Sequence, residues 1–330
     1  MQRFAALTLL AATHALHVSS HGTLNLPESR NGRQAGLGLR QGGRTQPYSV
    51  AYWFSDLTHM EGNATIADTN CSLLTTQCAG SPRCEQEGCA GSRLARMPWR
   101  APGSAVLTGG PCGTIGWDGA VPKGATMRGT DLPPSTEPPV WRIGGVEKVA
   151  WGLAVNHGGG YSYRLRKAPT GNSSQLTEEC FQRTVLRFEG NTSTIVGPRG
   201  ETFFTIPASR FITPDGAEWT RNPVPDTTGA DADANDDAPN FPPPVPGLAG
   251  HCCDEGCPDG CGDGFGRHGF GRIWNIMDQV RVPRRLSPGN YVLSWRWDAE
   301  ELPQVWTNCA DVRLQAGIAS KLEGGLGGSG

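Results

Sequence analysis

The sequence predicts an all-β fold: an antiparallel β-sandwich of the immunoglobulin-like or fibronectin type III-like kind, with long loops pinned by disulfides. Three observations predict it. The turn formers Gly and Pro occur 46 and 26 times in 330 residues. Several short runs alternate apolar with smaller or polar residues at the period of two that is typical of half-buried strands. No long stretch has the 3.6-residue apolar period of an amphipathic helix, and short strands without interleaved helices favour a sandwich.

The first 20 residues are typical of a secretory signal peptide. Arg3 precedes a short apolar run, and small residues close the segment. The run is too short to cross a bilayer of about 30 Å, and no later segment has the roughly 20 apolar residues of a membrane helix. We therefore predict cleavage after Ser20, secretion to the extracellular space and a mature chain that begins at His21.

The expected strands follow one another along the rest of the chain. From Val149 the odd positions are apolar, and this register brings the chain to His157 at the end of a strand, directly before three glycines. The full set of predicted strands is Val149–Val155, Tyr161–Leu165, Thr184–Phe188, Glu201–Pro207, Ile273–Val282, Tyr291–Trp297 and Gln304–Leu314.

These strands predict a single β-sandwich domain over residues 21–315. An acidic, proline-rich insertion at about 214–264 cannot pack a core and is expected to be a flexible loop. The Gly-rich tail at 316–330 is expected to be disordered. The cysteine-dense segment 70–112 is expected to be a loop region held by disulfides.

Charge and cysteine content exclude some partners and indicate a compartment. A formal net charge of −2, without a polybasic or amphipathic stretch, predicts no nucleic-acid partner and no membrane partner, and we expect a monomer. The 11 cysteines of an exported chain predict a disulfide framework with one cysteine unpaired. Sequons at Asn63, Asn70, Asn172 and Asn191 fit the same compartment and predict a glycoprotein.

Several common metal-binding and catalytic motifs are incomplete or missing in this sequence. The acidic run from Asp231 lacks the glycine and the final glutamate of a calcium loop, with Asp236 and Pro242 in those places. The cysteines that follow His251 could form a zinc knuckle, but export favours disulfides. No serine-hydrolase, zincin or phosphate-loop motif is present, whereas a glycosidase needs only two carboxylates and stays a minor alternative.

Two histidines stand apart from the other three of the mature chain. His59, His251 and His268 are expected to be surface or hydrogen-bonded residues. His21, once it is the first residue, offers both an α-amine and an imidazole to a metal. His157 precedes glycines 158–160, which allow a close approach of backbone or of a flat ligand.

The segment HGTLNLPESRN, from His21 onward, resembles the start of the lytic polysaccharide monooxygenases, which include the group once called chitin-binding type-4 domains. Members begin with HG and continue with a PxSR segment. The resemblance implies that the amine and imidazole of His21 and the imidazole of His157, within AVNHGGGYSYRL, form a three-nitrogen copper site called the histidine brace.

Near its C-terminus the family has an axial aromatic residue three positions before a cysteine, sometimes with a glutamine two positions before the aromatic. Gln304, Trp306 and Cys309 fit this spacing. Tyr or Phe is usual in the family, so Trp306 is either axial to the copper or a core residue of the last strand. Gln304 shares the strand face of Trp306 and is expected to donate a hydrogen bond beside the metal.

The implied function is oxidative cleavage of glycosidic bonds, at C1 or C4, in an insoluble polysaccharide such as chitin or cellulose. The implied catalytic residues are His21, His157, Gln304 and Trp306. The enzyme would use one copper ion per chain, an external reductant, and hydrogen peroxide or dioxygen as co-substrate. Two alternatives remain: a non-catalytic polysaccharide-binding module, and a copper-carrying protein with the same brace.

Overall fold

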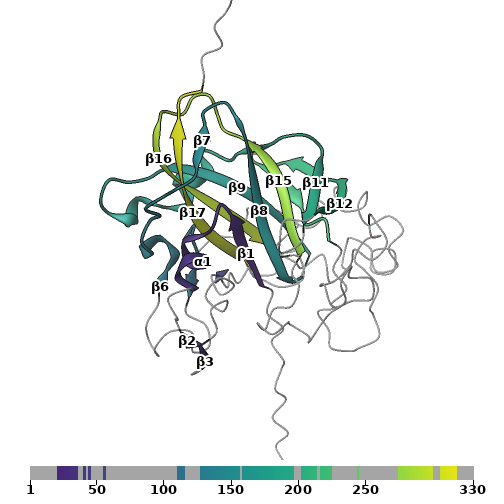
Figure 1. Cartoon of the computed structure of the whole chain (residues 1–330), viewed down its shortest axis with the longest axis horizontal. Helices are drawn as coiled ribbons and strands as arrows, with labels where there is room; N and C mark the ends of the chain where they lie inside the picture. The colour runs from purple at the N-terminus through teal and green to yellow at the C-terminus, as the bar shows by residue number, and fades with distance from the viewer. Residues whose placement is uncertain are drawn as a thin grey trace, which may run out of the picture.

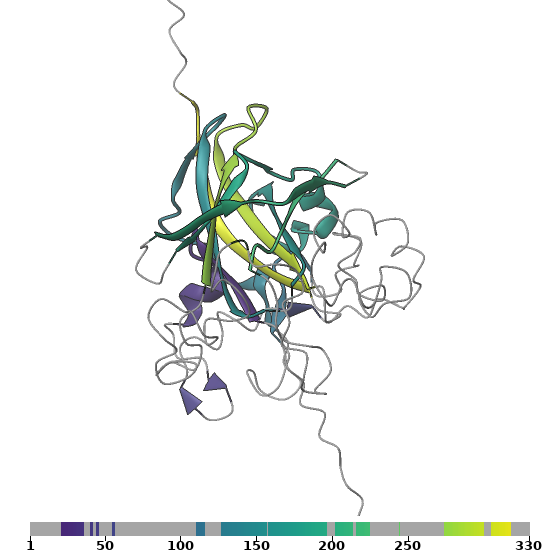
Figure 2. The same ribbon diagram turned by 90° about the vertical axis from the view of Figure 1, so that its right-hand side faces the viewer.

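Two β-sheets form separate layers of a sandwich (Figures 1 and 2). The computed structural model describes residues 21–35, 40–41, 44–45, 55–56, 110–115, 127–156, 158–196, 202–213, 216–224, 244, 274–299 and 305–317. Within these residues every strand pair is antiparallel except β7 with β17. The prediction of an all-β antiparallel sandwich is confirmed.

The first sheet carries the start of the predicted mature chain at its edge. Its strands, in spatial order, are β1 (His21–Leu26), β8 (Val146–Val155), β15 (Trp274–Arg281), β11 (Thr192–Val196) and β12 (Thr202–Pro207), and β10 (Arg187–Phe188) also pairs with β15.

The second sheet carries the last strand of the chain. Its order is β13 (Arg210–Ile212), β14 (Glu218–Arg221), β9 (Gly160–Lys167), β16 (Gly289–Asp298), β17 (Val305–Gln315), β4 (Ser55–Asp56), β5 (Thr114–Ile115) and β6 (Met127–Arg128), with β7 (Val140–Arg142) beside β17. A separate ribbon pairs β2 (Arg40–Gln41) with β3 (Arg44–Thr45), and the short helices are α1 (Arg30–Ala35) and α5 (Glu178–Gln182).

Most predicted strands are present, with two differences. The run 184–188 is strand only at β10, because α5 and its C-cap residue Arg183 lead directly into it, and Val185 makes only an isolated bridge. Part of the segment predicted as a flexible insertion, residues 216–224, is described, and it includes β14, which pairs with β9 in the second sheet and buries Trp219. Most of the insertion lies outside the described residues, as do the leader and nearly all of the tail.

Large aromatic side chains fill the core between the sheets. Trp151 of β8, Tyr161 and Tyr163 of β9, and Trp295 and Trp297 of β16 are fully buried. The Trp151 ring lies 5.1 Å, between centroids, from the rings of both Trp295 and Trp297. Such pairs stabilise a core beyond the area that they bury. The predicted apolar faces of β8 and β16 therefore both point inward.

A disulfide and a small apolar cluster cover the other side of the second sheet. Cys112 and Cys309 form the disulfide, which joins segments 197 residues apart. Leu176, Phe181 and Val292 pack around it. The predicted disulfide framework is thus present where the structure describes it, and Cys180 is a free thiol.

Buried charges lie on the same side of that sheet. Arg164 of β9 and Arg296 of β16 both donate to Oε1 of Glu178 on α5. Arg296 also forms two hydrogen bonds with Asp298, at 2.6 and 2.9 Å. Burial alone would raise the pKa of Glu178, but the two guanidinium groups outweigh it and lower that pKa. The helix is therefore attached to the sheet by a paired, charged cluster.

Two further predictions, on membrane spans and on glycosylation sites, concern residues that the structure describes. No helix among them is long and apolar enough to cross a bilayer. Asn172 and Asn191, two of the predicted glycosylation sites, are exposed.

Candidate metal centre

The backbone brings the two predicted copper-binding segments together at one edge of the first sheet. In the β1–β8 ladder, His21 is the partner of Val155, which lies two residues before His157. The ladder shifts register between His21 and Gly22. The side chain of His21 and the whole of His157 lie outside what the structure describes, but the residues beside each histidine are described.

Trp297 contacts both of these segments. A Cβ at Gly22 would lie 3.0 Å from Cε3 of Trp297 and 3.1 Å from Cη2 of Trp295, so a larger residue would have to push the two buried indoles back by a few tenths of an ångström. The indole Nε1 of Trp297 donates to the carbonyl of Gly158 at 2.7 Å. One buried side chain therefore touches the residue after each predicted histidine ligand.

The glycine segment is held by two buried asparagines. Asn156 Oδ1 accepts from the amide of Gly158 at 3.0 Å and from Nδ2 of Asn222 at 2.7 Å. The backbone N–H of Asn222 in turn donates to the carbonyl of Gly159 at 2.8 Å. Gly158 and Gly159 have φ values of +64° and +83°, which residues other than glycine rarely adopt. The residues on both sides of His157 are thus fixed in position.

A copper site built from nitrogen donors needs the two predicted donor segments close together, and the β1–β8 ladder brings their backbones together. Amine and imidazole nitrogens suit copper, and three of them leave coordination positions open. The ladder and Trp297 hold the two donor segments together, which lowers the entropy cost of assembling a site.

Trp306 is buried in the aromatic core, with 1% of its surface exposed. It is the β17 partner of Trp297 on β16, so the predicted axial residue lies next to the tryptophan that contacts both histidine segments. β17 is also joined to β1, because the amide of Leu24 donates to Oδ1 of Asn308 at 2.8 Å. Gln304 lies outside the described residues.

A buried polar pair anchors the strand that follows the glycines. The hydroxyl of Tyr161 donates to Asp278 Oδ2 at 2.6 Å, and Ser193 donates to Oδ1 at 2.7 Å. Burial raises the pKa of the Asp278 carboxyl and, together with Asp278, raises the pKa of Tyr161. Tyr161 therefore stays a neutral donor that ties β9 to β15 across the core.

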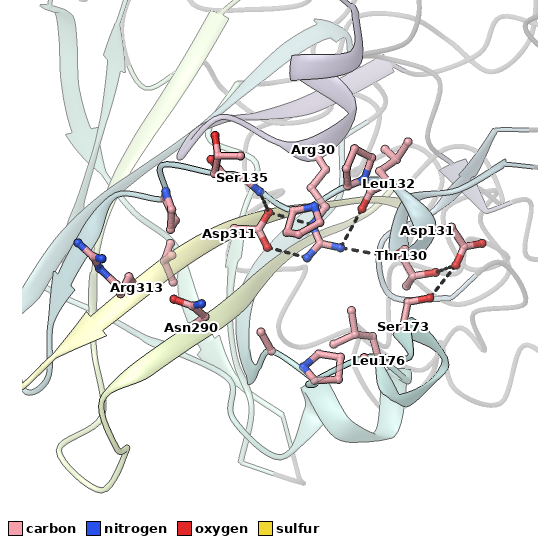
Figure 3. A pocket seen from close by; sticks show the side chains of 18 residues that line it. Arg30, Thr130, Asp131, Leu132, Ser135, Ser173, Leu176, Asn290, Asp311 and Arg313 are labelled. Carbon is pink, nitrogen blue, oxygen red and sulfur yellow. Dashed lines mark hydrogen bonds and ion pairs between the residues drawn. The ribbon is translucent and has the colours of Figure 1, made fainter.

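The PxSR segment has a structural role that the structure makes plain. Arg30 forms two hydrogen bonds with Asp311 of β17, at 2.6 and 3.0 Å, and also donates to the carbonyls of Thr130 and Leu132 (Figure 3). Ser29 Oγ accepts from the amide of Gly32 at the start of α1. The segment thus fastens the first strand and helix to the last strand, beside a pocket of about 530 Å³.

Sequence reasoning missed Trp297, Asn156 and Asn222 as parts of this site. The alternating pattern of β16 places Trp297 on the core face, but only the paired register shows where its indole N–H points. Asn156 precedes the predicted histidine ligand, and this adjacency was the only signal in the sequence. Asn222 is distant in sequence and gave none.

No known family profile matches the chain, and no curated protein sequence matches it. Solved structures that resemble it include lytic polysaccharide monooxygenases, a chitin-binding domain and a family 123 glycoside hydrolase from Clostridium perfringens. A copper complex of the cellulose-active CelS2 shares 13% identity over 90% of this chain and 100% of its own, with a TM-score of 0.32. The AA15 enzyme from Thermobia domestica shares 12% over 90% and 99%, at 0.32. A chitin-binding domain from Burkholderia pseudomallei shares 12% over 90% and 100%, at 0.33.

Proposed function

We propose that the protein is a secreted, copper-dependent lytic polysaccharide monooxygenase. It binds one copper ion through the amine and imidazole of His21 and the imidazole of His157, and it cleaves an insoluble polysaccharide oxidatively at C1 or C4. The observation that carries the proposal is the position of Trp297, whose ring lies against Gly22 and whose indole N–H binds Gly158. A single rigid side chain thereby connects the residues after both histidines.

Each residue has a distinct task in this proposal. His21 and His157 bind the metal, and Asn156, Asn222 and Trp297 hold the backbone that carries them. Trp306 covers one side of the site, and Gln304 donates a hydrogen bond next to it. Copper, when bound, supplies the one-electron chemistry by which peroxide or dioxygen oxidises a sugar C–H bond after an external reductant has acted.

The first test concerns the start of the mature chain and the metal. N-terminal sequencing of the secreted protein should give HGTLNLPE, because any other start removes the chelating amine. His157→Ala should abolish tight Cu(II) binding in calorimetry, whereas His59→Ala, His251→Ala and His268→Ala should retain it. Equal losses in all four variants would reject the brace.

The second test concerns activity. The copper-loaded protein, given ascorbate and peroxide, should release oxidised oligosaccharides from chitin or cellulose, identified by mass spectrometry. His157→Ala should release none. Binding to the insoluble glycan without oxidised products would identify a binding module instead, and copper binding without glycan binding would identify a copper carrier.

A further inference from the structure

A second, positively charged pocket lies at the opposite end of the first sheet from the metal centre. His21 pairs with one end of β8 at Val155, and Arg281 pairs with the other end at Val146. At about 3.3 Å per residue, the two ends are roughly 30 Å apart along the strand. The pocket has a volume of about 300 Å³ and lies where β10, β15, α5 and the β13–β14 turn meet.

Four arginines line this pocket, and none of its lining residues in the described part of the chain is acidic. They are Arg183, the C-cap of α5, Arg187 of β10, Arg281 of β15 and Arg285 in the turn after β15. Arg281 is paired with Glu189 at 2.7 Å. In the part of the chain that the structure describes, Arg183, Arg187 and Arg285 form no ion pair with a carboxylate.

Two of these arginines are placed at a cost to the sheet. Arg187 and Arg281 are direct cross-strand partners, so their side chains leave the same face of the sheet side by side. Like charges in this arrangement destabilise a strand pair. Glu189 holds the Arg281 guanidinium and leaves the charge of Arg187 uncompensated at the pocket. An anion bound between the arginines would remove this repulsion.

We propose that this pocket binds a tetrahedral oxyanion, sulfate or phosphate. Guanidinium groups present paired N–H donors whose spacing matches oxyanion oxygens. The pocket is at the lower end of the 300–1,000 Å³ that is typical of ligand sites, and an oxyanion alone fills only part of it. A sugar ring that carries the anion as an ester therefore has space beside it. This site is independent of the metal centre.

Calorimetry on the full secreted chain at low ionic strength tests the proposal. The ligands are inorganic phosphate, inorganic sulfate, glucose 6-phosphate and glucose 6-sulfate, and glucose serves as the blank. Saturable binding is expected for the anions and not for glucose. Tighter binding of the esters assigns the site to an anionic sugar, and equal binding assigns it to the free ion. Absence of saturable binding for all four anions would overturn the proposal.

Substitutions separate a built site from general positive charge. Arg187→Gln combined with Arg285→Gln should weaken anion binding at least tenfold. Arg284→Gln is the control for the Arg285 substitution, because each removes one charge from the same turn and the Arg284 side chain lies outside the pocket, against Gly144. Since Arg187→Gln relieves a like-charge pair, the melting temperature of the free protein should not fall. A loss in the control equal to that in the double variant would refute a specific site.

Discussion

Trp297 is the residue that connects the two histidine segments, and Trp295 is its natural control. Both are fully buried on the same face of β16, and both lie close to Gly22. Only Trp297 has a hydrogen bond to Gly158, whereas Nε1 of Trp295 has no hydrogen-bond partner among the residues that the structure describes. The two indoles therefore differ chiefly in one interaction.

Trp297→Phe should weaken Cu(II) binding at least fivefold, while Trp295→Phe should leave it within a factor of two. Both variants lose core volume, but only the first leaves the Gly158 carbonyl without its buried donor, at an added stability cost of about 1–3 kcal/mol. Calorimetry with Cu(II) and chemical denaturation measure the two effects. Equal copper affinities in the two variants would show that Trp297 does not position the site.

A substitution of Trp306, the cross-strand partner of Trp297, tests whether this side chain faces the metal. If it is axial to copper, Trp306→Tyr should change the Cu(II) electron paramagnetic resonance spectrum and the rate of reductant-driven peroxide turnover, with the fold retained. If it is only a core residue, the variant should lower the melting temperature and leave the spectrum unchanged, because a smaller ring leaves a void.

At the scale of elements, Glu178 decides how α5 is attached to the second sheet. Glu178→Gln leaves Arg164 and Arg296 buried with less countercharge. Removal of one partner from a buried ion pair costs about 3–5 kcal/mol. Denaturation with urea should show this loss, whereas Glu179→Gln, on the exposed side of the same helix, should be nearly neutral.

The same carboxylate gives the wild-type protein an acid limit. Folding lowers the pKa of Glu178 below its ordinary value of 4.5, so its stabilisation is complete above about pH 4.5 and is lost as the pH falls through the lower folded pKa. In Glu178→Gln this part of the pH dependence of unfolding should disappear. An unchanged acid profile in the variant would contradict the assignment.

Long alternating runs predicted elements well, and short or polar ones did not. β8, β9, β15, β16 and β17 were predicted because their apolar residues recur every second position. β1 was not, since its sequence, HGTLNL, shows a weaker alternation and becomes a strand through pairing with β8. β7 has three residues, too few for a pattern, and β16 buries charges such as Arg296 that a sequence pattern assigns to solvent.

The candidate metal centre was predictable to a similar extent. His21 and His157 carry local signals, namely a cleavage site and a glycine run, and the ladder brings their segments together. The backbone segments that carry the two histidines are held by contacts with residues distant in sequence. An example is the hydrogen bond from Trp297 to Gly158, 139 residues away. No local pattern encodes such a contact, because it arises only when two sheets are stacked in register.

For the whole molecule, the cysteine count predicts a single thiol. Cys112 and Cys309 are paired and Cys180 is free, which leaves an even number of the 11 cysteines to pair among themselves. A hydrogen bond with Thr177 and the nearby Arg166 and Arg183 lower the pKa of the Cys180 thiol. The native protein should react with one equivalent of Ellman's reagent, and Cys180→Ser with none. Two or more equivalents would contradict the pairing.

The disulfide between Cys112 and Cys309 also decides what happens to a chain that a protease has cut. It links two cysteines that are 197 positions apart in the sequence, and the ring that it closes includes β8, β9 and β15, with β17 lying across its end. A single break anywhere inside this ring leaves one covalent molecule, with both halves still paired across the sheets. In protease-rich surroundings such a protein can be nicked once and keep its strands in place, and its two fragments would separate only after the disulfide is reduced.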